Sequence, residues 1–140
     1  WLDLPMPPRK LESIMKEITN DHKPFYISDC VPSFCMERFK DIFELNSFLN
    51  RIQRYSDTNQ KKIVFLLDII ECTPEESFQN YKLVDFYPEM NLKEMALRQT
   101  SALDIIQSPT KGNFIDIDQK IGELLRRGYY ESDEGIFWYM

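Results

Sequence analysis

Side chains that could act as nucleophiles, general bases or metal ligands are scarce in this chain. Histidine occurs once, at His22, and cysteine occurs at Cys30, Cys35 and Cys72. A lone histidine with no identifiable partner seldom makes a catalytic site, so we expect His22 in a turn that ends a helix. A zinc site built from these four residues is the alternative, but the spacing of Cys30 and Cys35 is loose and no second pair follows. Buried free cysteines are the favoured interpretation.

Two pairs of adjacent carboxylates have structural explanations. Glu75 and Glu76 follow Thr73 and Pro74, which is the pattern of a helix start with a capping residue, a proline and a glutamate. Asp133-Glu134 lies in a predicted turn. No glycine-rich phosphate loop occurs in the sequence. We therefore expect no catalytic site, no cofactor and no bound metal.

Composition and charge narrow the class of protein. Of the 140 residues, 43% are hydrophobic and 14% are aromatic, which is enough for a packed core. No apolar run approaches the roughly 20 residues of a membrane span, and no signal peptide is recognisable. The chain begins with Trp1 rather than Met, so we expect a piece of a longer, soluble, intracellular protein.

Acidic residues are concentrated in the second half of the chain. Lysine plus arginine balance aspartate plus glutamate over residues 1–70, so residues 71–140 carry the whole net charge of -6. A surface that holds DNA through its phosphates should instead be basic. The charge distribution therefore favours a protein partner over nucleic acid.

The first 60 residues are predicted to form a helical extension. A first helix has its apolar stripe at Leu11, Ile14, Met15 and Ile18. A second helix, capped by Ser33, would carry one apolar face made of Met36, Phe39 and Phe43. A third helix would begin at Asn46, and its side chains facing the core would be Phe48, Leu49 and Ile52. The polar stretch 56–62 is predicted to be an exposed loop, which places an internal boundary between residues 1–60 and 61–140, and the two parts are predicted to pack together as one compact unit.

Helical patterns continue beyond this boundary. The apolar run 63–70 fits a buried helix or a buried strand, and helix is the favoured assignment. After the helix start at Thr73, Asn91 and Glu94 repeat the capping pattern for a longer helix that ends before Pro109. Its apolar face would consist of Leu92, Met95, Ala96, Leu103 and Ile106.

The last segment predicts a helix followed by a β-hairpin. Asp116 can cap a helix over 117–127, which Gly128 would end. Its apolar positions are Ile117, Ile121, Leu124 and Leu125. Its exposed positions would be Asp118, Gln119, Lys120, Glu123, Arg126 and Arg127. Two strands, 129–131 and 136–139, would flank a turn at 132–135. We therefore predict a mainly α fold with a C-terminal β-hairpin, in which residues 61–140 form a winged helix-turn-helix.

The winged helix offers two kinds of partner-binding residues. The aromatic strands would leave some rings near solvent, and exposed Tyr and Trp often anchor protein interfaces, although these rings could equally be core. The predicted partner-binding residues are Tyr130, Trp138, Tyr139, Arg126 and Arg127. A nucleic-acid contact would instead use Lys111, Lys120, Arg126 and Arg127. It is disfavoured because acidic residues, rather than base-reading side chains, stand at the start of the helix.

The segment FIDIDQKIGELLRRGYYESDEGIFWYM, residues 114–140, resembles the winged-helix part of the middle subunit of the CST telomere complex, which is related to the middle subunit of replication protein A. The shared pattern is an Ile/Leu helix, a glycine, a strand, an acidic turn and an aromatic strand. The resemblance implies a nuclear, non-enzymatic docking domain that contacts telomerase or polymerase α–primase. A nucleic-acid-binding winged helix, or a helical adaptor whose strands pair with a partner's sheet, are the alternatives.

Overall fold

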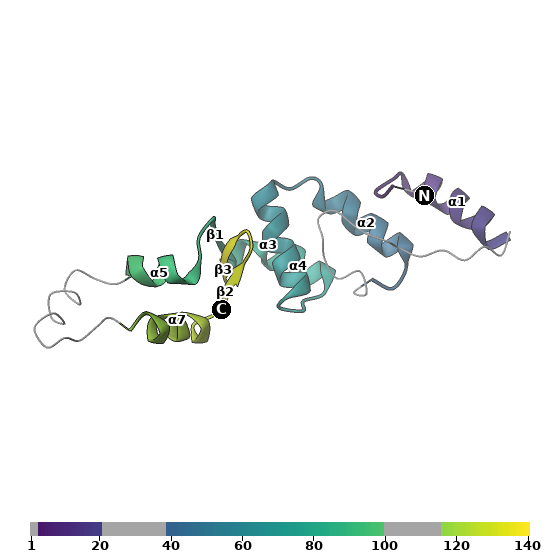
Figure 1. The fold of residues 1–140 in the computed structure, drawn as a ribbon. Coiled ribbons are helices and arrows are strands. Elements are labelled where there is room, and N and C mark those ends of the chain that lie inside the picture. The colour runs from purple at the N-terminus through teal and green to yellow at the C-terminus, as the bar shows by residue number, and fades with distance from the viewer. Residues whose placement is uncertain (1–2, 21–38, 100–115) are drawn as a thin grey trace, which may run out of the picture. The chain divides into compact units, whose positions relative to one another are not determined.

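The computed structural model describes residues 3–20, 39–99 and 116–140, which belong to two compact units, Trp1–Tyr81 and Lys82–Met140 (Figure 1). The first unit is helical, and the second combines helices with a three-stranded antiparallel sheet. The predicted fold class is confirmed: the chain is mainly helical with a small C-terminal sheet in a winged-helix-like arrangement. No helix among the described residues is long and apolar enough to cross a membrane.

The core of the first unit lies among three short helices. The helices of this part of the chain are α1 (Pro8–Asn20), α2 (Ile42–Ile52), α3 (Asp57–Asp68) and α4 (Pro74–Asn80), followed by the 3₁₀ helix η2 (Tyr81–Leu83). Helices α2, α3 and α4 bury Leu45, Phe48, Leu49, Ile52, Ile63, Leu67 and Phe78 against one another. The Phe48 ring lies between those of Phe39 and Phe78, with centroid separations of 5.0 and 5.2 Å.

The predicted stripe of α1 is confirmed. Leu11 and Met15 are buried together with Met6, and Ile14 and Ile18 pack partly buried against them. The helix ends at Asn20. The amphipathic spacing is therefore sufficient to identify both the helix and its buried face.

The predicted loop at 56–62 is wrong, because most of this stretch is the first half of α3. Ser56 caps the helix: its hydroxyl accepts a hydrogen bond from the backbone amide of Asn59 at 3.3 Å. The run 63–70 is helical as far as Asp68, in agreement with the favoured assignment. The two compact units divide after Tyr81, whereas the sequence places the boundary at 60–61, inside α3.

The start of α2 also differs from the prediction. The helix begins at Ile42 rather than Asn46, because Asp41 offers an earlier cap whose carboxylate accepts from the amide of Glu44 at 2.9 Å. Phe43 therefore belongs to α2, where it is 41% exposed instead of lying on a buried face. Phe39, another member of the predicted second helix, precedes α2 and packs partly buried against the core of the first unit. Ser33 and Met36 lie outside the described residues.

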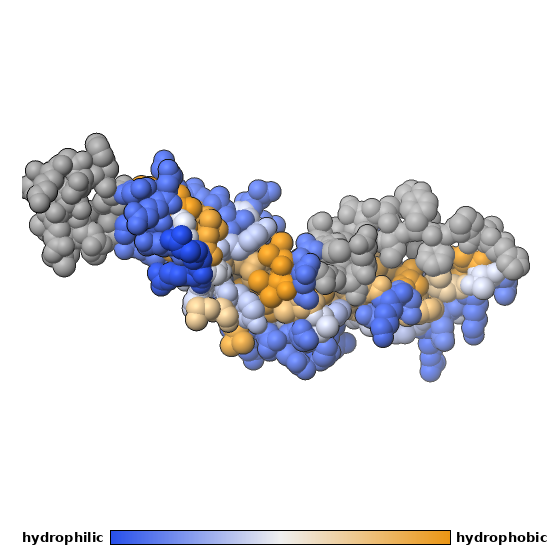
Figure 2. Space-filling model, turned by 90° about the horizontal axis from the view of Figure 1, so that it is seen from below, coloured by the Kyte–Doolittle hydropathy of each residue, from blue (hydrophilic) through white to orange (hydrophobic). Residues whose placement is uncertain are grey.

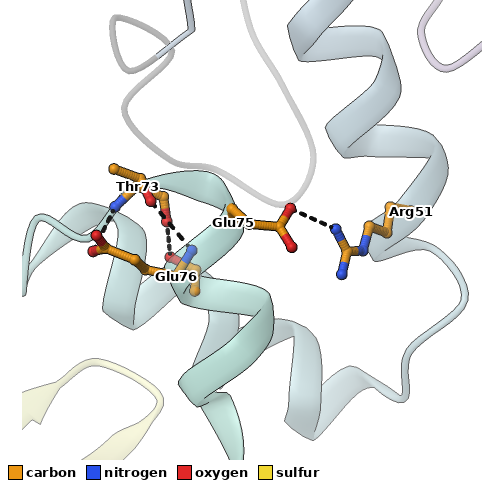
Figure 3. A network of polar contacts seen from close by, with 5 residues as sticks. Arg51, Thr73, Glu75 and Glu76 are labelled. Carbon is orange, nitrogen blue, oxygen red and sulfur yellow. Dashed lines mark hydrogen bonds and ion pairs between the residues drawn. The ribbon is translucent and has the colours of Figure 1, made fainter.

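The start of α4 is confirmed in detail (Figure 3). The Thr73 hydroxyl accepts from the amide of Glu76, and the Glu76 carboxylate accepts from the amide of Thr73, at 3.2 and 3.3 Å. Glu75 points away from this box and forms an ion pair with Arg51 of α2 at 3.0 Å. The Arg51 guanidinium also lies 4.0 Å from the centre of the Phe78 ring. The two glutamates thus serve the helix start and its contact with α2.

The second unit contains β1 (Asp85–Pro88), α5 (Leu92–Gln99), α7 (Ile117–Arg126), β2 (Tyr129–Ser132) and β3 (Gly135–Trp138). The strands lie in the order β1-β3-β2. The hairpin of β2 and β3 is confirmed, and β1 is an addition that the sequence did not predict. Leu103, Ile106 and Pro109, which were assigned to the helix from Leu92, lie outside the described residues.

Helices α5 and α7 pack against each other and against one face of the sheet. The shared core consists of Leu92, Met95, Ala96, Leu124 and Ile136, with Ile117, Ile121, Tyr87 and Tyr129 partly buried around it. Leu125 was predicted to join this core but is 52% exposed. It follows Leu124 by one position, which is a rotation of about 100° around the helix axis.

A buried asparagine holds the N-terminal segment on α2. The Asn46 side chain accepts a hydrogen bond from the Met6 amide at 2.9 Å and donates one to the Met6 carbonyl at 3.0 Å. Asn50 donates to the same carbonyl at 3.2 Å. Asn46 is buried, and it is hydrogen-bonded to both backbone polar groups of Met6.

We expect Asn46→Ala to lower the free energy of unfolding by about 1–3 kcal/mol, because both polar groups of the Met6 backbone lose a buried partner. Urea unfolding followed by circular dichroism measures this change. Ser47→Ala, at the exposed neighbouring position, is the matched control. Equal stability of the two variants would contradict the assigned role of Asn46.

Candidate interaction surface

The end of α7 fixes the position of the hairpin. The Asp116 carboxylate caps the start of the helix by accepting from the Gln119 amide at 3.0 Å, and the helix ends at Arg126, one residue earlier than predicted. Gly128 follows with a φ of 96°, and a Cβ there would lie 2.6 Å from the Tyr139 carbonyl oxygen. Only glycine allows both this backbone conformation and this close approach.

Trp138 has a hydrogen-bonding role within the second unit. Its indole Nε1 donates to the Arg127 carbonyl at 2.8 Å, and so satisfies one of the carbonyls left open at the end of α7. Its ring lies 5.8 Å from that of Tyr129. The side chain is half-buried, which leaves part of the ring at the surface.

The predicted aromatic residues do not form one surface. Trp138 pairs with Tyr129 across the strands, whereas Tyr130 pairs with Phe137. Because side chains alternate along a strand, Tyr130 lies on the face opposite to Trp138. Tyr139 follows β3 and is half-buried, and its amide donates to the Gly128 carbonyl at 3.4 Å. Tyr130 and Trp138 therefore belong to different faces of the sheet.

The cations of α7 gather near its C-terminal end. Arg126 and Arg127 are exposed, as predicted, and Lys120 is half-buried. Lys120 and Arg127 line an open pocket of about 120 Å³ between α5 and α7. The other residues of this pocket are Ala96, Gln99, Glu123 and Leu124. Lys111, proposed for a nucleic-acid contact, lies outside the described residues.

Acidic side chains occupy the start of α7 and the β2–β3 turn. Asp116 and Asp118 are exposed in the first turn of the helix, and Asp133 and Glu134 are exposed at the turn. Glu131 of β2 reaches α5 instead, where its carboxylate accepts from the Leu92 amide at 3.2 Å. Asn91 caps the same helix by accepting from the Glu94 amide at 2.8 Å.

Sequence reasoning missed the contact of Glu131 with α5 and the pocket between the helices. Side chains alternate along β2, which puts Glu131 on the same face as Tyr129, and this alternation was the available signal for the contact of Glu131 with α5. The pocket had no signal in sequence, because its two walls are separated along the chain. Among the coloured residues of the face drawn in Figure 2, hydrophilic ones predominate, with hydrophobic residues exposed in patches between them.

Among the described residues, no three His, Cys, Asp or Glu side chains lie close enough together to hold a metal ion. His22, Cys30 and Cys35 lie outside these residues. Burial, and then the negative charge of Glu76, raise the pKa of the Cys72 thiol above its ordinary value. A raised pKa disfavours the thiolate that nucleophilic chemistry needs.

The chain matches no model of a known protein family, no curated protein and no solved structure.

We expect Trp138→Phe to lower the free energy of unfolding by about 0.5–1.5 kcal/mol, because it removes the indole hydrogen bond and keeps an aromatic ring on Tyr129. Urea unfolding again measures the change. Tyr130→Phe, which removes a polar group from the opposite face of the sheet, is the comparison variant. If Trp138→Phe left the free energy of unfolding unchanged, the hydrogen bond to Arg127 would not contribute to stability.

Proposed function

We propose that this chain is a non-enzymatic docking module whose second unit binds a protein subunit of a telomere-maintenance or DNA-replication complex in the nucleus. The resemblance of residues 114–140 to the CST middle subunit suggests telomerase or polymerase α–primase as the partner. The reason for choosing a protein over DNA is physical and comes from the second unit itself.

The acidic start of α7 carries this proposal. A recognition helix normally reads base edges with residues near its N-terminus. Here the first turn presents Asp116 and Asp118, and the Asp116 carboxylate is engaged as the cap. Two carboxylates at this position would repel the phosphates on both sides of a groove. The exposed carboxylates of the β2–β3 turn add to the same negative field.

Exposed apolar side chains on the helices support docking to a protein. Leu97 of α5 and Leu125 of α7 are each more than half exposed, and Tyr130 is exposed on the sheet. Isolated exposed apolar residues are ordinary on a protein surface. Combined with an acidic recognition helix, however, they favour burial against a protein rather than against a phosphate backbone.

A nucleic-acid contact is the second candidate, because Lys120, Arg126 and Arg127 share the C-terminal part of α7. Arginines at that end can contact a phosphate backbone without reading bases. A helical adaptor whose hairpin pairs with a partner's sheet is the third candidate, and it would have to use the outer edge of β2, since β3 already pairs with β1 on one side and β2 on the other.

We expect no binding of the 140-residue chain to duplex or G-rich single-stranded DNA at concentrations of about tens of micromolar, even at low salt, because the start of α7 repels phosphates. Fluorescence anisotropy with labelled DNA at low and moderate salt measures this. Binding that is tight and weakens steeply with salt would replace the docking proposal with the nucleic-acid alternative.

For the protein partner, we expect purified polymerase α–primase or the telomerase catalytic subunit to bind the immobilised chain. Leu125→Ser should weaken binding by about fivefold or more, because it removes an exposed apolar contact of α7. Leu83→Ser, which changes another exposed leucine outside α5 and α7, serves as the control and should leave binding intact. Binding of neither complex, measured by biolayer interferometry, would remove the proposed partners.

A further inference from the structure

The pocket between α5 and α7 is formed by one stripe from each helix. Lys120, Glu123, Leu124 and Arg127 follow one another at i, i+3, i+4 and i+7 on α7. Ala96 and Gln99 provide the facing wall from α5 at i and i+3. These spacings place each set on one side of its helix. All six residues belong to the second unit.

The pocket has a small apolar base, and polar side chains form most of its lining. Ala96 and Leu124 are 1% and 3% exposed, so they form its closed part. Gln99, Lys120 and Arg127 bring hydrogen-bond donors to the rim, and Glu123 brings the one carboxylate among the six. Within the described part of the chain, the Lys120 and Arg127 side chains form no ion pair and no hydrogen bond.

Donors that have no partner among the described residues, placed around a small pocket, match a carboxylate. A lysine ammonium and an arginine fork can both donate to one carboxylate, and such charge-assisted hydrogen bonds are stronger than neutral ones. The volume of about 120 Å³ suits a single side chain. A nucleic-acid strand would bring phosphates past Glu123 and the acidic first turn of α7, so a single carboxylate fits better than a polyanion.

We infer that this pocket receives an acidic side chain, aspartate or glutamate, from a peptide segment of the protein partner, with Lys120 and Arg127 as the binding residues. The inference rests on the proposed docking function and names the chemistry of the segment that docks. Gln99 donates a further hydrogen bond to the same segment, and the apolar base contacts the methylene groups of the incoming side chain.

The test is an NMR titration of the isotope-labelled full chain with a short peptide that contains one glutamate and no other charged side chain. The same peptide with glutamine in place of this glutamate is the matched ligand control. We expect the glutamate peptide to shift amide signals of residues 120–127 and 96–99, and the glutamine peptide to leave them unchanged. Equal shifts with both peptides, or shifts only elsewhere in the chain, would overturn the inference.

Variants that remove one positive charge test whether the peptide binds at the pocket. We expect Lys120→Gln and Arg127→Gln each to lower the affinity for the glutamate peptide by roughly two- to fivefold. The double variant K120Q/R127Q should lower it by about tenfold. Arg98→Gln, which removes an exposed cation of α5 outside the pocket lining, should change affinity by less than about twofold. An equal loss with Arg98→Gln would mean non-specific attraction and would overturn the assignment. The amide spectrum of each variant reports whether it remains folded.

The pocket and the docking proposal fail in different ways. If polymerase α–primase or the telomerase subunit bound the wild-type chain and K120Q/R127Q equally well, the pocket assignment would be wrong and protein docking would stand. If the glutamate peptide bound as expected and neither complex bound, the pocket would stand and the proposed partners would be wrong. A labelled duplex that displaced the peptide would show that the pocket accepts phosphates, and would overturn the carboxylate assignment.

Discussion

The contact of α5 and α7 with one face of the sheet is the constraint on which the second unit depends. Three strands of four residues each are too short to be stable alone. Their stability must come from the core around Leu124 and Ile136, where the two helices and the central strand bury apolar surface together. The sheet and the helices therefore form as one structure.

Two polar contacts between the hairpin and the helix ends fix the register of this packing. The indole of Trp138, which pairs with Tyr129 at the start of β2, donates to the Arg127 carbonyl just after α7. The Glu131 carboxylate of β2 accepts from the Leu92 amide at the start of α5. Both satisfy backbone groups that helix ends leave open. A negative carboxylate at the start of α5 also interacts favourably with the helix dipole. Aromatic and acidic residues that resemble partner-binding groups in sequence thus include some that hold the unit together.

The local signals of this sequence were enough to predict some of its helix ends. Thr73, Asp116 and Gly128 act within a few residues of their own positions, so their roles could be inferred without the fold. Ser56 carried the same kind of signal, but the polar residues after it were interpreted as a loop because they form the exposed first turns of α3. Strand β1 was missed because its four residues end in proline and gain their structure only by pairing with β3.

The candidate site shows the same division between local and distant causes. The exposure of Arg126 and Arg127 followed from the helical period of α7, and the spacing alone predicted it. The hydrogen bond of Trp138 could not be predicted, because its acceptor lies eleven residues away across the turn of the chain at Gly128. The pocket depends on Ala96 and Gln99 as much as on Lys120 and Arg127, and only packing brings these pairs together.

The carboxylates at the surface of the second unit act on a partner from a distance, whereas Lys120 and Arg127 would act on a bound carboxylate by direct contact. At physiological ionic strength the Debye length is about 8 Å, so the carboxylates at the start of α7 and at the β2–β3 turn affect an approaching partner mainly at short range and at low salt. A carboxylate already seated between Lys120 and Arg127 would be in direct contact and less exposed to screening ions. Added salt would weaken the repulsion outside the pocket more than the attraction inside it. Binding of an acidic segment should therefore depend only weakly on salt, in contrast to DNA, whose binding releases counterions and falls steeply with salt.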